Sequence, residues 1–251
     1  MVPSRRSPED PWPAGPQVHR PLLVDQSWVD AIFLHWRIPA AAAARHLPPG
    51  VEPDIFCGST WVGLIGFQMR GTRVGTVLPV PYLGTFTEIN VRLYSRGRDG
   101  SRGVVFLSLD AARLLPVLGA RLLHFPYVWS RCRPLAGGRG EYGYDVDRRG
   151  GGARSRFAVL PDLKRQATDP LSLELTARFG LHARIAGRTV FIPNSHRPWP
   201  LHPAELTQLE DHLVAAAGIA VAGPPESVLF SPGVRAVFGR PSLVQRNGAS
   251  A

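Results

Sequence analysis

The feature that most constrains the fold is the alternating stretch Thr85–Tyr94, which reads TFTEINVRLY. Side chains alternate across a β-strand, so its three aliphatic residues share one face and Glu88, Asn90 and Arg92 share the other. Such a pattern demands a sheet with one face packed on an apolar layer. If the polar face lines an enclosed space, it supplies a proton acceptor, an amide and an anion-binding guanidinium.

The polar face has two interpretations. It is a solvated surface or a salt-bridge network between two layers, or it is the wall of a cavity. Residues four apart in a strand are roughly 13 Å apart along the backbone, so Glu88 and Arg92 need separate partners. A buried charge without a partner is costly. On an inward face, Ser108, Asp110, Arg121 or a ligand would therefore have to compensate.

The rest of the chain indicates many short strands and a few helices. A hairpin is expected between Glu88–Tyr94 and Val104–Asp110, because the turn-forming segment Arg96–Gly103 joins them. Further strands are expected at Trp28–Ile38, Val51–Phe56, Trp61–Arg70, Tyr142–Asp147, Arg156–Leu160, Gly180–Ile185, Arg188–Ile192, Ser227–Phe230 and Val234–Phe238. Helices are expected at Ala40–His46, Ala111–Leu123, Leu171–Arg178 and Ala204–Ala217, and loops at Thr72–Leu83 and Asn194–Leu201. The pattern predicts one α+β, mostly antiparallel domain over residues 23–240, after a disordered tail at 1–22 and before a flexible tail at 241–251.

Cysteine content and hydropathy limit the cellular compartments in which the protein is expected. With 251 residues the chain is long enough for a full core. Cys57 and Cys132 stand alone, without the spacing of a metal site or a disulfide framework, which fits a reducing cytoplasm. The longest apolar run, Leu213–Ala222, is too short to span a bilayer. We expect a cytoplasmic protein with no metal, no cofactor and no membrane partner.

The charge is strongly basic, with a formal net charge of +10 and a pI near 10.8. Lys164 is the only lysine, and the other 28 basic residues are arginines scattered along the chain. A GC-rich coding sequence produces this bias without functional demand, and no nucleic-acid-binding motif accompanies it. Nucleic-acid association is therefore the weakest of the functional alternatives.

Three of the eight histidines are candidate site residues. His35 lies between Leu34 and Trp36, a setting typical of a core histidine. His124 and His196 each lie where an expected element ends in an aromatic, proline-containing turn. No nucleophile elbow, phosphate-binding loop, dinucleotide-binding glycine pattern or metalloprotease motif is present. The common catalytic classes are therefore unsupported.

Five segments in order carry a resemblance to a known family. They are LHWRIPAAAARHLPPGVEPD, WVGLIGFQMRG, FTEINVRLY, GVVFLSLDA and SHRPWPLHPAEL. This order resembles the uncharacterised YqjF-like family, which is similar to a branch of the acetoacetate decarboxylase-like superfamily. The resemblance covers Trp28 to Phe238. It implies a mostly antiparallel, double-split β-barrel-like fold that encloses a cavity, with a few helices packed outside.

The resemblance also implies a site. Acetoacetate decarboxylases hold a Schiff-base lysine, a neighbouring lysine, glutamates and an arginine in the cavity, and Glu88 falls where the superfamily places a cavity glutamate. The lysine pair follows an aromatic-proline dipeptide, and the equivalent stretch here is Phe125–Val128, which has no lysine. Lys164 lies far from it. Imine formation needs an amine nucleophile, so decarboxylation through a Schiff base is not expected.

The leading hypothesis is a small-molecule enzyme that uses non-covalent acid/base chemistry on a carbonyl or enolate-forming substrate. A lyase, dehydratase or cyclase, with secondary metabolism as its setting, would fit. The expected catalytic residues are Glu88 as base and Tyr127 or His124 as acid. The expected substrate-binding residues are Asn90, Arg92, Arg121, His196 and His35. The alternative is a non-catalytic ligand-binding or scaffold protein that retains the barrel, and the sequence leaves a homo-oligomer open.

Overall fold

The computed structural model describes residues 15–18, 21–56, 58–74, 78–79, 84–113, 125–136, 138 and 140–244. This part of the chain forms one mixed sheet with three short helices. The strands are β1 Val24–Ile38, β2 Val51–Pro53, β3 Thr60–Val74, β4 Leu78–Pro79, β5 Phe86–Gly97, β6 Arg102–Ala111, β7 Tyr127–Ala136, β8 Tyr142–Arg148, β9 Arg154–Pro161, β10 Gly180–Ile185, β11 Arg188–His196, β12 His202–Asp211, β13 Ser227–Phe238 and β14 Ser242–Leu243. The helices are α1 Ala40–Ala44, α3 Pro170–Thr176 and α4 Leu213–Ala216.

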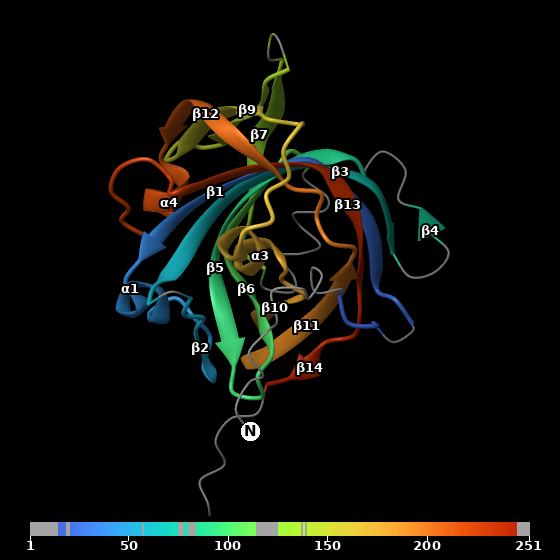
Figure 1. Cartoon of the computed structure of the whole chain (residues 1–251). Coiled ribbons are helices and arrows are strands. Elements are labelled where there is room, and N and C mark those ends of the chain that lie inside the picture. The colour runs from blue at the N-terminus through green and yellow to red at the C-terminus, as the bar shows by residue number, and fades with distance from the viewer. Residues whose placement is uncertain are drawn as a thin grey trace, which may run out of the picture.

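The strand pairings close two rings that share one wall. The first ring has nine strands in the order β6, β7, β8, β9, β12, β13, β1, β3 and β5, and returns to β6. The second has seven strands, because β10 and β11 connect β6 directly to β13. Two pairings, β6–β7 and β6–β10, are parallel. Figure 1 shows the long shared strands with β7, β9 and β12 above them and β10 and β11 below. The closed, mostly antiparallel barrel expected from the sequence is therefore present.

Alternation along the shared strands assigns each side chain to one ring. On β5, the aliphatic residues face the nine-stranded ring, which is filled by a large apolar cluster. The cluster includes Ile32, Leu34, Val62, Leu64, Ile89, Val91, Leu93, Tyr144, Phe157 and Phe230. The intervening residues of the same strands face the seven-stranded ring. The polar face of β5 therefore points into the smaller ring and not into solvent.

Bulges bend the shared strands and shift this alternation. In β1, the register with β3 shifts between Val29 and Ile32, and Asp30 adopts a left-handed backbone with φ of 53°. The Tyr144 hydroxyl donates to the Asp30 carbonyl at 2.7 Å and holds the bend from across the nine-stranded ring. On β3, a Cβ at Gly66 would lie 2.6 Å from the Tyr144 ring, so the close approach of the two walls requires glycine there.

One predicted helix is wrong. Ala204–Ala217 was expected to be an amphipathic helix, but β12 occupies His202–Asp211 and pairs with β9. Only Leu213–Ala216 is helical, and the Asp211 carboxylate accepts the first free amides of that turn. Closure of the nine-stranded ring requires a strand between β9 and β13, and this pairing outweighs local helix propensity.

Other expected elements differ at their boundaries. Ser227–Phe230 and Val234–Phe238 form one continuous strand, β13. The expected loop Thr72–Leu83 contains the end of β3 and the short strand β4, and Asn194–His196 belongs to β11. The expected helix Ala111–Leu123 lies outside the described residues from residue 114 onward, and Ala111 itself ends β6.

The hairpin of β5 and β6 is confirmed, as are helices near Ala40 and Leu171. Within the segment expected to be a C-terminal tail, β14 pairs with β11. None of the helices in the described ranges has the length and apolar content needed to cross a membrane.

Candidate functional site

The seven-stranded ring surrounds a cavity of about 480 Å³, a size suited to a small molecule. Its polar lining residues are Gln26, Glu88, Asn90, Arg92 and Tyr127. The rest of its wall is mainly aliphatic and aromatic: Leu23, Val24, Trp28, Phe33, Ile65, Phe67, Met69, Phe106, Leu109, Phe125, Leu181, Ile185, Ile192, Trp199, Phe238 and Pro241. The structure thus brings four of the predicted site residues into one enclosed space.

Glu88 and Tyr127 form the central pair of the site. The Tyr127 hydroxyl donates to Glu88 Oε2 at 2.9 Å, joining β7 to β5. Glu88 is only 3% exposed, and burial raises the pKa of its carboxyl to about 7, against the opposing effect of hydrogen bonds from Tyr127 and Asn90. Burial and the nearby Glu88 carboxylate hold the pKa of Tyr127 well above its usual value. Glu88 is therefore poised to exchange a proton near neutral pH, while Tyr127 remains a donor.

Asn90 presents an unsatisfied acceptor. Its side chain is 2% exposed and donates to the Glu88 carboxylate, which lowers the Glu88 pKa. Its Oδ1 atom has no hydrogen-bond partner among the described residues, although the side chain lines the cavity. A buried amide oxygen without a partner is destabilising. A ligand hydroxyl or N–H group in the cavity would satisfy it.

Arg92 contributes a cation without a carboxylate. Its guanidinium donates to the Tyr94 hydroxyl at 3.3 and 3.4 Å and to the Leu175 carbonyl at 3.3 Å. Within the described ranges, none of the ion pairs involves Arg92. By contrast, the neighbouring Arg178 is paired with Asp54. Arg92 is therefore the cavity group available to bind an anion.

Asp110 does not balance the charge of Arg92 or hydrogen-bond to Glu88, although the sequence made it a candidate partner on an inward face. It faces away from the cavity, where Arg148 donates to its two oxygens at 2.8 and 2.9 Å and Ser130 donates at 2.7 Å. The register of β5 and β6 shifts between Val91 and Arg92, which is the mark of a bulge in β6. The bulge reverses the face of the residues that follow it. Asp110 influences the cavity only at a distance, by adding to the rise in the Glu88 pKa.

The predicted histidines lie outside the cavity wall or outside the described residues. His35 is completely buried and its Nε2 lies 2.6 Å from the Tyr94 hydroxyl; burial holds its pKa well below its usual value. His196 packs edge-on against the rings of Trp28 and Trp199 but is not itself among the residues that line the cavity. The two remaining candidates, His124 and Arg121, fall in the segment 114–124, which the structure does not describe.

Tyr127 lies at the start of β7, in the stretch that the sequence resemblance aligned with the lysine pair of the decarboxylases. Lys164, the only lysine of the chain, is exposed in the turn after β9, where its amide donates to Asp162. It does not line the cavity. No amine side chain is therefore available for a Schiff base. Among the described residues there is also no cluster of three or more His, Cys, Asp or Glu side chains that could hold a metal ion.

The aromatic part of the wall was not predicted from the sequence. Trp28 and Phe33 lie on β1 on either side of the bulge, and both face the cavity although they are an odd number of residues apart. Strict alternation would have placed them on opposite faces. Trp199 comes from the loop after β11 and stacks on Trp28 with ring centroids 5.7 Å apart. The only sequence feature that could have indicated this part of the wall was the high content of aromatic and proline residues around Trp199.

Comparison with known proteins identifies the family. Residues 25–235 match DUF2071, which is described as "Uncharacterized conserved protein (COG2071)". The chain belongs to the DUF2071 family. One relative is the uncharacterized protein YqjF of Bacillus subtilis (strain 168), which is 28% identical over 209 residues and is matched over 82% of this chain and 84% of its own. The YqjF-like resemblance seen in the sequence is thereby confirmed.

Solved structures resemble the DUF2071 chain in fold. The enduracididine biosynthesis enzyme MppR, complexed with the condensation product of pyruvate and imidazole 4-carboxaldehyde, aligns with a TM-score of 0.62 at 17% identity, covering 92% of each chain. Acetoacetate decarboxylase from Legionella pneumophila aligns with a TM-score of 0.62 at 14% identity, covering 98% of this chain and 93% of that one. An acetoacetate decarboxylase-like enzyme from Sphingomonas wittichii RW1 aligns at 0.63 and 14% identity, covering 89% and 94%. At these identities the likeness establishes the fold.

Proposed function

We propose that this DUF2071 protein is an enzyme that moves a proton on a small carbonyl compound by non-covalent acid/base chemistry. The observation that carries the proposal is Glu88, a buried carboxyl with a pKa of about 7 in the wall of the cavity. A general base works best when its pKa lies near the working pH. A carboxyl that served only packing would gain nothing from lying in this apolar site.

The cavity favours a substrate with a carboxylate and an apolar body. Arg92 has no carboxylate partner among the described residues and would bind the substrate anion. The aromatic and aliphatic wall would accommodate the hydrocarbon part. A 2-oxo acid combines these features, and the structural relative MppR has been solved in complex with pyruvate. The same shape suits a 2-oxo acid that carries a further hydroxyl.

The chemistry then follows from the positions of the groups. Glu88 removes a proton from the carbon beside the carbonyl, and the electron pair of that C–H bond moves onto the carbonyl oxygen to form an enolate. Arg92 stabilises the enolate and carboxylate oxygens. Asn90 Oδ1 accepts a hydrogen bond from a substrate hydroxyl, and protonated Glu88 can return its proton to carbon or pass it to that hydroxyl as it leaves as water. Together, a base, an anion-binding guanidinium and a hydrogen-bond acceptor fit enolisation and dehydration.

Hydrogen exchange tests this proposal without knowledge of the natural substrate. Pyruvate and 4-methyl-2-oxopentanoate are incubated with the protein in D₂O, and loss of the C3 proton signal is followed by NMR. The wild type is expected to exchange at least one of them faster than buffer. Glu88→Gln should reduce this enzymatic rate by roughly 100-fold or more, since general base catalysis contributes about 10²–10⁴-fold.

The matched control is Glu210→Gln, which makes the same change on an exposed residue of β12 and should leave the rate unchanged. Affinity for the oxo acid is measured in parallel. Glu88→Gln should bind it nearly as well as the wild type, because Arg92 remains. Tight binding without exchange in the wild type would favour the non-catalytic ligand-binding alternative and reject the enzyme.

A further inference from the structure

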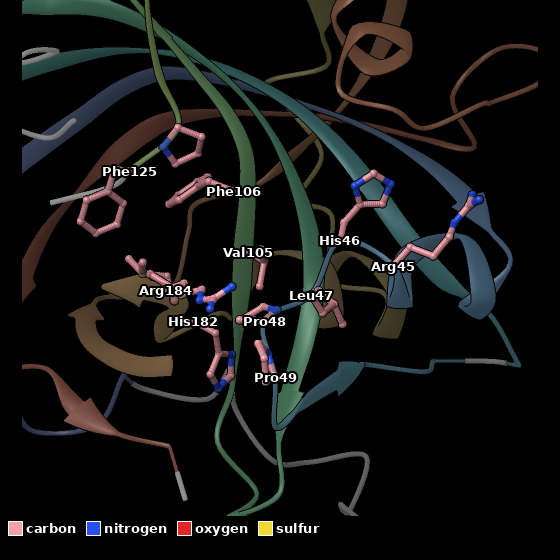
Figure 2. A pocket seen from close by; sticks show the side chains of 13 residues that line it. Arg45, His46, Leu47, Pro48, Pro49, Val105, Phe106, Phe125, His182 and Arg184 are labelled. Carbon is pink, nitrogen blue, oxygen red and sulfur yellow. The ribbon is translucent and has the colours of Figure 1, made fainter. Parts of the chain in front are cut away.

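A second pocket lies on the outside of the barrel wall and shares three side chains with the inner cavity. It has a volume of about 320 Å³ and lies between the α1–β2 segment and strands β6 and β10. Figure 2 shows this pocket with Phe106 and Phe125 at one end and His182 and Arg184 at the other. Phe106, Phe125 and Leu181 line both this outer pocket and the cavity that holds Glu88. The two spaces therefore adjoin at these three residues.

The backbone is open at the same place. β6 and β10 are joined by a single parallel ladder pair, Leu181 with Val104. On its other edge, β6 pairs with β5 along a ladder from Glu88 to Arg96. The wall between β6 and β10 is therefore closed by side chains more than by main-chain hydrogen bonds. Phe106 and Phe125 are partly exposed, and rotamer changes of such side chains are fast compared with strand separation.

The outer pocket carries positive charge and no carboxylate among its described lining residues. Arg184 is exposed and takes part in none of the ion pairs within the described ranges. His182 is neutral near pH 7, because burial lowers its pKa to about 4, and Ser95 and Ser101 hold its ring nitrogens at 2.9 and 3.1 Å. Arg45 lies on the far side of the pocket (Figure 2). The free charge nearest the shared side chains is thus that of Arg184.

We propose that the outer pocket is the entrance through which carboxylate ligands reach the cavity. Arg184 captures the carboxylate, Phe106, Phe125 and Leu181 form the gate, and Arg92 holds the anion inside. Two guanidiniums in series on the two sides of an apolar gate draw an anion inward by complementary charge. The inference rests on the proposed function in one respect, namely that the cavity takes a small carboxylate.

A rival route exists at Trp199, which lines both the cavity and a different surface pocket beside Arg197. Trp199 stacks on Trp28 and meets the Phe33 ring edge-on with centroids 5.1 Å apart. These contacts fix its ring. This wall is therefore closed more firmly than the gate at β6 and β10, and Arg197 supplies a control cation at the rival position.

Binding kinetics test the entrance. The association of 4-methyl-2-oxopentanoate is followed by stopped-flow fluorescence, because Trp28 and Trp199 line the cavity. At low salt, Arg184→Glu should slow association by about 3- to 10-fold, and the difference should shrink at about 0.5 M salt, where charges are screened over a few ångströms. The same charge reversal at Arg197 should leave the association rate unchanged.

The gate itself is tested at Leu181. Leu181→Ala widens the opening and should raise the association and dissociation rates by similar factors, so that the dissociation constant changes less than either rate. Leu181→Val makes the same change more mildly if the alanine variant does not fold. Equal association rates in Arg184→Glu and Arg197→Glu would overturn the entrance, as would the absence of any saturable fluorescence change in the wild type. Normal binding kinetics without hydrogen exchange would reject the acid/base function and leave the entrance standing.

Discussion

Glu88 is where burial and hydrogen bonding act most strongly against each other. Desolvation disfavours its ionised form, while the Tyr127 hydroxyl and the Asn90 amide favour it, and the balance leaves a pKa of about 7. The sequence placed Glu88, Asn90 and Arg92 on one face. It did not give the partner of Glu88 across the ring, because β5 and β7 meet only through the closure of the barrel. Tyr127 was a candidate through the family resemblance and not through any local pattern.

Removal of the Tyr127 hydroxyl should raise the Glu88 pKa further. In Tyr127→Phe the carboxylate loses its main hydrogen-bond donor, so its ionised form becomes less stable. The hydrogen-exchange rate should then rise at a higher pH than in the wild type. Tyr142→Phe is the control, since that ring packs in the nine-stranded ring. An unchanged or more acidic profile in Tyr127→Phe would show that the hydroxyl does not stabilise the carboxylate.

The raised pKa of Glu88 should also appear in stability. The folded state holds the Glu88 proton up to about pH 7, whereas the unfolded chain releases it near its ordinary value of 4.5, so stability declines as pH rises between these values. Glu88→Gln has no ionisable group at this position, so it does not lose stability in this way as pH rises. The free energy of unfolding of Glu88→Gln minus that of the wild type should therefore be larger at pH 8 than at pH 4, by on the order of 3 kcal/mol. Urea unfolding of both proteins at both pH values measures this. If the variant and the wild type differed by the same amount at pH 4 and pH 8, the Glu88 pKa would lie near its ordinary value.

Bulges decide at the level of the strands which residues reach the site. The alternation of β5 was read correctly because this strand keeps its period, but β1 and β6 each carry a bulge. The bulge in β6 sent Asp110 to the other face, and the bulge in β1 brought Trp28 and Phe33 together. Asp30 adopts a left-handed backbone, which aspartate tolerates better than most residues, but a single aspartate in a strand does not predict a bulge. The strand β12 was missed because ring closure outweighs the helix propensity of Ala204–Ala217.

The buried pair of Asp110 and Arg148 should be important for the stability of β6 against β8. Asp110 is 0% exposed, and Arg148 donates to both of its oxygens. Asp110→Ala would leave the guanidinium largely buried without a partner, at a cost of about 3–5 kcal/mol. The control is Asp147→Ala, which removes an exposed pair with Arg131 and should cost less than about 1 kcal/mol. Urea unfolding measures both losses of stability. Similar losses in the two variants would contradict a stabilising role for the buried pair.

At the scale of the whole fold, the described residues form two rings that share the walls β1, β3, β5, β6 and β13. The nine-stranded ring is filled with apolar side chains that pack against the shared strands, and the seven-stranded ring contains the cavity. The family resemblance predicted this fold over nearly the whole chain. It could not supply the chemistry, because the lysines that define the decarboxylases are absent and Tyr127 lies in that stretch instead. Which groups surround Glu88 depends on distances across the ring, which only the folded chain defines.

The pH dependence of hydrogen exchange tests the central claim most directly. With 4-methyl-2-oxopentanoate or pyruvate in D₂O, the wild-type rate should rise with pH and level off above about pH 7, as Glu88 loses its proton. Glu88→Gln should show only the buffer rate across the same range. A wild-type rate that equals the buffer rate at every pH, or a Glu88→Gln variant that retains the rise near pH 7, would contradict the account.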